Sequence, residues 1–274
     1  MRIALVSFNQ IWQDKIENLE RCRDFVKLAH AQGCQLVIFP EMTLTGYSLN
    51  LDATAEDVNQ SRTMVAFSEL ASEFALDIVF GCCLHNGNGS SAQNVLCHSQ
   101  SKNDTKAIYA KLHPFSFAGE DNFIEAGDHL GFVELPTIRL GASICYDLRF
   151  PIPYALMASK CSGVICIANW PERRISHWQA LLVARAIENQ MFMIGVNRIG
   201  VDGNGLAYVK SSLVVAPNGE IVPPVSSSEE FDIYDIDETR TAQYRMEFPT
   251  LRDSNFQLYI KLSELMEVNA YVDG

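Results

Sequence analysis

Two kinds of hydrophobic pattern alternate along the chain. In one, apolar residues recur every three or four positions, as in residues 14–31, which is typical of an amphipathic helix. In the other, a short continuous apolar run such as residues 35–39 is typical of a strand buried on both faces. The patterns predict helices at 14–31, 58–74, 151–160 and 176–190, and strands at 2–8, 35–39, 77–84, 93–98, 105–111, 137–144, 163–168 and 191–197.

Toward the end of the chain the predicted strands follow one another closely, at 211–216, 220–222 and 231–236. Turn-forming residues occupy positions 86–89 and 217–219. No internal repeat or linker interrupts the alternation, so we predict one α/β domain over residues 1–274. The last ~35 residues are less regular, and we expect them to pack on a partner subunit.

Composition fits this prediction and excludes several function classes. A chain of 274 residues is long enough for one large α/β domain, and 48% apolar with 20% charged residues is ordinary for a globular protein. The net charge of −12 argues against a nucleic-acid partner, because phosphate binding needs a basic face, and it does not favour an acidic membrane surface. No apolar run reaches the roughly 20 residues of a membrane-spanning helix. A strand begins at Arg2 without a secretory leader pattern, so we expect a cytoplasmic protein.

The eight cysteines are better explained as free thiols than as a disulfide framework or a metal site. Several of them stand in or beside apolar runs, where free cysteines are commonly buried. No pair of C-x-x-C units has zinc-ligand spacing. We therefore expect no metal and no other cofactor.

Three predicted strands end at a chemically active residue. Glu41 follows the strand at 35–39, Lys111 ends the strand at 105–111, and Cys145 follows the strand at 137–144. Sites of α/β sheets lie outside the carboxyl ends of strands, so we expect these three side chains to converge. Taken singly, the glutamate and the lysine would be ordinary surface residues and the cysteine a core residue.

Together the three residues form a coherent set for nucleophilic catalysis. Glu41 can take the proton from the Cys145 thiol, since only the thiolate is a good nucleophile. We expect the helix predicted after Cys145 to favour that thiolate through its N-terminus. Lys111 can meet the oxyanion that forms when a carbonyl is attacked, and the backbone N–H of Tyr146 can be a second donor.

The residues around each member resemble the Glu–Lys–Cys signature of the nitrilase superfamily of carbon–nitrogen hydrolases. The three stretches read FPEMTLTGY (39–47), KLHPF (111–115) and ICYDLRFP (144–151), in that order along the chain. The resemblance covers nearly the whole sequence. It implies a four-layer α–β–β–α sandwich in a single domain, which forms homodimers or larger homo-oligomers. It also implies that Glu120 helps to position the lysine or the substrate.

A further set of stretches resembles the omega-amidases within this superfamily. These read IANWP (167–171), HW (177–178), ARAIENQ (184–190) and VNRIG (196–200). The resemblance implies hydrolysis of the side-chain amide of 2-oxoglutaramate or 2-oxosuccinamate to the dicarboxylate and ammonia, through a thioester on Cys145.

Such substrates carry a carboxylate, which a guanidinium binds well in a bidentate fork. Arg149, Arg173 and Arg174 follow the ends of two predicted strands, and we favour Arg173 or Arg174 as the anchor. Trp170, Phe115 and Tyr47 are candidate apolar walls of the pocket. The alternatives are that the arginines are ordinary surface residues and that Trp170 belongs to the core.

Two other functions stay open from the sequence. One is a different superfamily hydrolase, such as another amidase, a nitrilase or an N-carbamoyl hydrolase. The other is a non-catalytic binding protein on the same fold. The complete set of Glu41, Lys111 and Cys145 favours an enzyme, because a binding role does not require a base, an ammonium and a thiol together.

Overall fold

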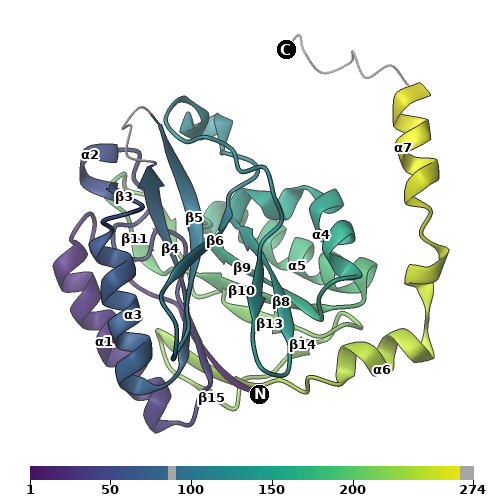
Figure 1. The fold of residues 1–274 in the computed structure, drawn as a ribbon, viewed down its shortest axis with the longest axis horizontal. Helices are drawn as coiled ribbons and strands as arrows, with labels where there is room; N and C mark the ends of the chain where they lie inside the picture. Colours follow the sequence, from purple (N-terminus) through teal and green to yellow (C-terminus); the bar gives the residue numbers. More distant parts are fainter. Residues whose placement is uncertain (86–90, 266–274) are drawn as a thin grey trace.

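The computed structural model describes residues 1–85 and 91–265, and Figure 1 shows their arrangement. Within these residues the strands form two large sheets and one small hairpin, β11 (Gly200–Val201) with β12 (Ala207–Tyr208). The first sheet has the order β15 (Ser226–Ser227), β16 (Phe231–Asp235), β1 (Arg2–Val6), β2 (Leu36–Ile38), β4 (Asp77–His85), β5 (Ala92–Ser99) and β6 (Lys106–Ala110), with β3 (Ala55–Asp57) beside β4. The second has the order β14 (Ile221–Val222), β13 (Leu213–Val215), β10 (Phe192–Asn197), β9 (Gly163–Ala168), β8 (Arg139–Ile144) and β7 (Phe132–Glu134).

Helices cover the outer face of each sheet. On the first sheet lie α1 (Lys15–Ala31) and α3 (Arg62–Phe74), and on the second lie α4 (Pro151–Ala158) and α5 (Ile175–Asn189) (Figure 1). The other helical segments are α2 (Leu51–Thr54), α6 (Arg240–Glu247), α7 (Phe256–Leu265), and the 3₁₀ turns η1 (Ser116–Ala118), η2 (Glu120–Asn122), η3 (Cys145–Arg149), η4 (Glu172–Arg174) and η5 (Thr250–Asp253).

The alternation of side chains along each strand explains why the layers stack. In β1, Ile3 and Leu5 point into a core shared by the two sheets, while Ala4 and Val6 pack under the helices. In β9 of the second sheet the side chains alternate in the same way, and Ile165 points into the shared core. Each fully buried aliphatic side chain contributes about 1.5–3 kcal/mol relative to exposure. The result is the four-layer α–β–β–α sandwich predicted from the sequence, which is confirmed.

Parallel strands lie at the centre of both sheets. β1, β2 and β4 run parallel in the first sheet, and β8, β9 and β10 run parallel in the second. Antiparallel strands complete the edges. The carboxyl ends of β2, β6, β8 and β9 therefore carry the loops that form the site described below.

The structure differs from the predicted elements at several places. α3 begins at Arg62 rather than at residue 58, because the hydroxyl of Ser61 accepts the Met64 N–H and caps the helix there. The chain beyond residue 239, predicted to be irregular, contains α6 and α7. The turn predicted at 86–89 lies outside the described residues.

The cysteines and the helices bear on two further expectations. All eight cysteines are free thiols, and every one except Cys145 is buried. Across residues 1–85 and 91–265, no helix has the length and apolar character needed to cross a bilayer. The cytoplasmic location stays a prediction.

Candidate active site

Glu41 is held in a tight turn at the end of β2. The turn packs directly against Gly81 of β4, where an added Cβ would lie 2.6 Å from the Met42 nitrogen. Met42 has a positive φ of 46°, which is uncommon for a non-glycine residue. The Thr43 N–H donates to the Gly81 carbonyl (2.8 Å), and the Gly81 N–H donates to the Thr43 hydroxyl (3.1 Å). Gly81 is thus required for the close approach that places Glu41.

Lys111 lies between two carboxylates. Its Nζ is 3.1 Å from Glu41 Oε1 and 2.8 Å from Glu120 Oε2, and all three side chains are fully buried. Burial alone would lower the pKa of Lys111, but the two carboxylates outweigh it and hold that pKa well above its usual range. Burial alone would raise the pKa of Glu120, and the Lys111 ammonium holds it below its usual range. We call Glu41, Lys111 and Glu120 the buried charge network.

Two neighbours fix the geometry of this network. Asn94 of β5 donates from Nδ2 to Glu41 Oε1 (2.7 Å) and to Glu120 Oε1 (3.1 Å). Glu120 Oε2 also accepts the Phe115 N–H at 2.6 Å, which closes the loop that follows Lys111. Glu120 therefore orients both the lysine and a wall of the pocket.

Cys145 stands at the end of β8 in a left-handed conformation, with φ 47°. Its Sγ is 3.9 Å from the Asn169 carbonyl and is partly accessible. Burial raises the pKa of the Cys145 thiol well above its usual range, the Glu41 carboxylate raises it further, and Lys111 opposes this shift. The segment after Cys145 is the short 3₁₀ turn η3, and α4 begins only at Pro151. The α-helix predicted after Cys145 thus begins six residues beyond the thiol, and the support of the thiolate by its N-terminus stays a prediction.

Asn169, at the end of β9, connects the two sheets at the site. Its N–H donates to Glu41 Oε2 (2.9 Å), and its side-chain amide donates to the Glu41 carbonyl (2.7 Å). Because its own carbonyl faces the Cys145 thiol, Asn169 contacts both the base and the thiol. Asn169 was not among the site residues predicted from the sequence, although it follows an apolar strand as Glu41 and Cys145 do.

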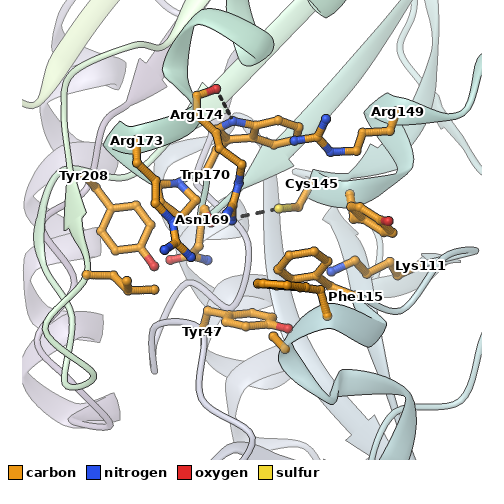
Figure 2. Close-up of a pocket in the computed structure, with 15 residues that line it drawn as sticks. Tyr47, Lys111, Phe115, Cys145, Arg149, Asn169, Trp170, Arg173, Arg174 and Tyr208 are labelled. Carbon is orange, nitrogen blue, oxygen red and sulfur yellow. Dashed lines mark hydrogen bonds between the residues drawn. The ribbon is translucent and has the colours of Figure 1, made fainter.

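A cavity of about 230 Å³ opens over Cys145 and Lys111. Figure 2 shows these two side chains at one side of the cavity and Tyr208 with Arg173 at the other. Tyr47, Phe115, Trp170 and Tyr146 also line it, so every predicted site residue except the two glutamates reaches the cavity. Glu41 and Glu120 lie behind Lys111.

Three arginines surround the cavity, and we call Arg149, Arg173 and Arg174 the arginine rim. The Arg149 guanidinium stacks on Trp170 at 4.8 Å, and that of Arg174 lies over Phe115 at 5.5 Å. Burial and the repulsion of the other two arginines lower the pKa of Arg174. Among the ion pairs of residues 1–85 and 91–265, none includes an arginine of the rim.

This arrangement is suited to attack on a carbonyl group. It combines a partly accessible thiol, a carboxylate that can accept its proton, and an ammonium that can meet the developing oxyanion. In the described part of the chain, no group of three or more His, Cys, Asp or Glu side chains is placed to hold a metal ion.

Comparison with known proteins agrees with this chemistry. A model of the carbon–nitrogen hydrolase family matches residues 2–246. The chain is 32% identical over 262 residues to the omega-amidase YafV of Escherichia coli K12, covering 94% of this chain and 99% of that protein. It is 29% identical over 259 residues to the 2-oxoglutaramate amidase of Bacillus subtilis 168, covering 94% and 98%.

A solved structure is similar over most of its length. XC1258 from Xanthomonas campestris, described as a CN-hydrolase superfamily protein with an arsenic adduct in the active site, superposes with a TM-score of 0.85. It is 29% identical, and the match covers 93% of this chain and 97% of that one.

Proposed function

The chain belongs to the carbon–nitrogen hydrolase family and is an amide-hydrolysing enzyme, and on that premise we propose that it acts on the side-chain amide of 2-oxo acid amides. The substrates are 2-oxoglutaramate and 2-oxosuccinamate, and the products are the 2-oxo dicarboxylate and ammonia. The names of the Escherichia coli and Bacillus subtilis relatives support this substrate class.

The observation that carries the substrate assignment is the arginine rim. Three guanidinium groups border one small cavity, and within the described residues they form no ion pair with a carboxylate. Burial lowers the pKa of Arg174, and repulsion by the other two arginines lowers it further, so a bound anion relieves an unfavourable interaction. An arginine binds a carboxylate in a bidentate fork. Of the two favoured candidates for this contact, Arg174 is half-buried and the adjacent Arg173 is exposed.

The first half of the proposed reaction acylates the enzyme. Glu41 takes the proton of the Cys145 thiol, and the sulfur attacks the amide carbon while Lys111 and the Tyr146 N–H stabilise the oxyanion. The carbon–nitrogen bond then breaks, and ammonia leaves with the proton that Glu41 held. The raised pKa of the Cys145 thiol supports this role for Glu41, because the resting thiol needs a base.

The second half releases the acid. A water molecule gives a proton to Glu41 and attacks the thioester carbon. The carbon–sulfur bond breaks, and the proton returns from Glu41 to the Cys145 sulfur. Losing one oxyanion donor in sites of this type costs about 10²–10³ in rate. Glu120 takes no proton in this scheme and holds Lys111 in place.

A substrate panel with ammonia detection tests the assignment. We expect 2-oxoglutaramate or 2-oxosuccinamate to give a higher kcat/KM than aliphatic nitriles, plain aliphatic amides or N-carbamoyl amino acids. A higher kcat/KM for one of those other substrate classes would assign the enzyme to another branch of the family. Lack of turnover on the whole panel would favour a binding protein. Near-wild-type activity in Cys145→Ala or Glu41→Gln would contradict the proposed roles.

The partner of the proposed enzyme is a second copy of the chain, bound through the C-terminal segment. α7 stands apart from the sheets in Figure 1, and its large apolar side chains are 37–53% exposed: Phe256, Leu258, Tyr259, Ile260 and Leu262. Three of them, Phe256, Tyr259 and Ile260, border a groove of about 830 Å³ beside exposed Ile152 and Leu156 of α4. Exposed apolar surface of this kind marks an interaction site.

Sedimentation of the full chain tests this assembly. We expect a dimer, and we expect Ile260→Asp to shift the protein toward the monomer while the matched surface change Lys261→Glu does not. A monomeric wild-type protein at tens of micromolar would contradict the assembly. The absence of nucleic-acid and membrane partners stays a prediction.

A further inference from the structure

Asp147 is a buried carboxylate that the reaction scheme leaves without a role. Its side chain is 1% exposed, and four donors converge on its two oxygens. Oδ1 accepts the N–H of His113 (2.9 Å) and hydrogen-bonds with His113 Nδ1 (2.8 Å). Oδ2 accepts the Tyr109 hydroxyl (2.7 Å) and the Ile144 N–H (3.1 Å). A carboxylate with this many donors at good distances is well suited to hold segments together.

Two of these segments flank Lys111. Tyr109 stands two residues before the lysine at the end of β6, and His113 stands two residues after it. Asp147 thus holds the Tyr109 side chain on one side of Lys111 and the His113 backbone and ring on the other. The phenol of Tyr109 is buried, and its pKa is well above the usual range because of burial and the adjacent carboxylate, so it remains an O–H donor.

The remaining segment carries the thiol. The Ile144 N–H that donates to Asp147 immediately precedes Cys145, and Asp147 follows two residues later, so the hydrogen bond closes a tight turn around Cys145. Cys145 has φ 47° in that turn, a conformation that costs of order 1 kcal/mol or more for a non-glycine residue. Such a conformation persists only when its surroundings hold it.

The Lys111 segment and the Cys145 turn come from different sheets, since β6 is an edge strand of the first sheet and β8 belongs to the second. Asn169 provides a second connection between the sheets, toward Glu41. We propose that Asp147 is a positioning residue, which fixes the Cys145 turn against the Lys111 segment and so sets the distance between the thiol and the ammonium. This inference rests on the proposed role of Cys145 as the nucleophile.

Asp147→Asn is the sharpest change, because it keeps the shape of the side chain and directs an NH₂ group at groups that are themselves donors. We expect kcat per active site, counted by stoichiometric alkylation of Cys145, to fall by roughly 10–100-fold with KM within about threefold of wild type. We also expect the pH midpoint of Cys145 alkylation by iodoacetamide to rise, since the Lys111 ammonium lowers the pKa of the thiol.

Two further variants keep the test decisive. Tyr109→Phe removes a single O–H donor and should shift both measurements in the same direction by a smaller amount; it decides the question if Asp147→Asn does not fold. Asp77→Asn is the matched control, because Asp77 also accepts from a histidine and a backbone N–H, but at the amino end of β4. We expect it to leave kcat and the alkylation midpoint unchanged.

The alternative is that Asp147 only stabilises the fold. In that case the melting temperature falls, while kcat per titrated site and the alkylation midpoint stay at wild-type values, and the proposal is overturned. The alkylation midpoint needs no substrate. A failure of the assignment to 2-oxo acid amides would therefore leave this test intact, and kcat can be measured with any amide that the wild type hydrolyses.

Discussion

The buried charge network and the arginine rim border the same cavity and are built in opposite ways. In the network, the Lys111 ammonium lies between the carboxylates of Glu41 and Glu120, and all three are inaccessible to solvent. In the rim, three like charges border one cavity, and Arg173 is exposed. A paired, buried set holds catalytic groups in place without a ligand. An unpaired cationic set is completed by an anion, which is the property of a recognition site.

Removing the central charge of the network should have the largest effect. Lys111→Met leaves two buried carboxylates without their cation, and breaking a buried pair costs about 3–5 kcal/mol of stability. We expect turnover to be undetectable and the free energy of unfolding in urea to fall by that amount. Wild-type stability in Lys111→Met would show that the network is not a paired unit.

Removing a charge of the rim should affect binding and not stability. In Arg174→Met, loss of charged hydrogen bonds of about 1.5–3 kcal/mol corresponds to a KM for 2-oxoglutaramate raised by about 10–150-fold. The KM for a neutral aliphatic amide should stay unchanged, as should the melting temperature. Arg173→Met and Arg149→Met, assayed in parallel, identify the main anchor. Equal losses for charged and neutral amides would contradict a recognition role for the rim.

The pH dependence of the free energy of unfolding should differ between variants of the buried charge network and variants of the arginine rim. Lys111 holds the pKa of Glu120 below its usual range, so its contribution to stability is present above the ordinary glutamate range and is lost as pH falls through the depressed pKa. We expect the unfolding free energy of Glu120→Gln to depend less steeply on pH in the acid range than that of wild type. Arg174→Met should follow the wild-type curve, because an arginine does not titrate there.

A change in salt concentration should give the smallest difference between the two regions, seen as an effect on KM without an effect on kcat. Exposed charges are screened with a Debye length of about 8 Å near 0.15 M salt, whereas buried pairs are screened much less. Raising the salt concentration should increase the KM for 2-oxoglutaramate by roughly two- to fivefold and leave its kcat unchanged. If kcat fell by the same factor by which KM rose, that result would argue against separate roles for the network and the rim.

The strand ends were predictable from the sequence, because apolar runs followed by Glu41, Lys111 and Cys145 are local patterns. The polar side chains that hold the site together were not predictable from it. Asn94, Asn169 and Asp147 act through contacts between residues distant in the chain, and a single sequence holds no signal for such pairs.

Two other features show the same limit. The positive φ of Cys145 and the 3₁₀ turn after it accompany the hydrogen bond from the Ile144 N–H to Asp147, which the pattern of apolar and polar residues does not reveal. In the part of the chain that the structure describes, Met246 of α6 and the large apolar side chains of residues 256–262 are exposed, so their pattern was not recognisable as one face of a core.

The central claim is that Cys145 alone among the eight cysteines forms a covalent intermediate. Rapid acid quench of the enzyme during turnover of 2-oxoglutaramate, followed by peptide mass spectrometry, tests it directly. We expect an adduct with the mass of the substrate minus ammonia on the peptide that contains Cys145, and no such adduct in Cys145→Ala. Steady ammonia release by the wild type with no adduct on that peptide, or an adduct on another cysteine, would contradict this role.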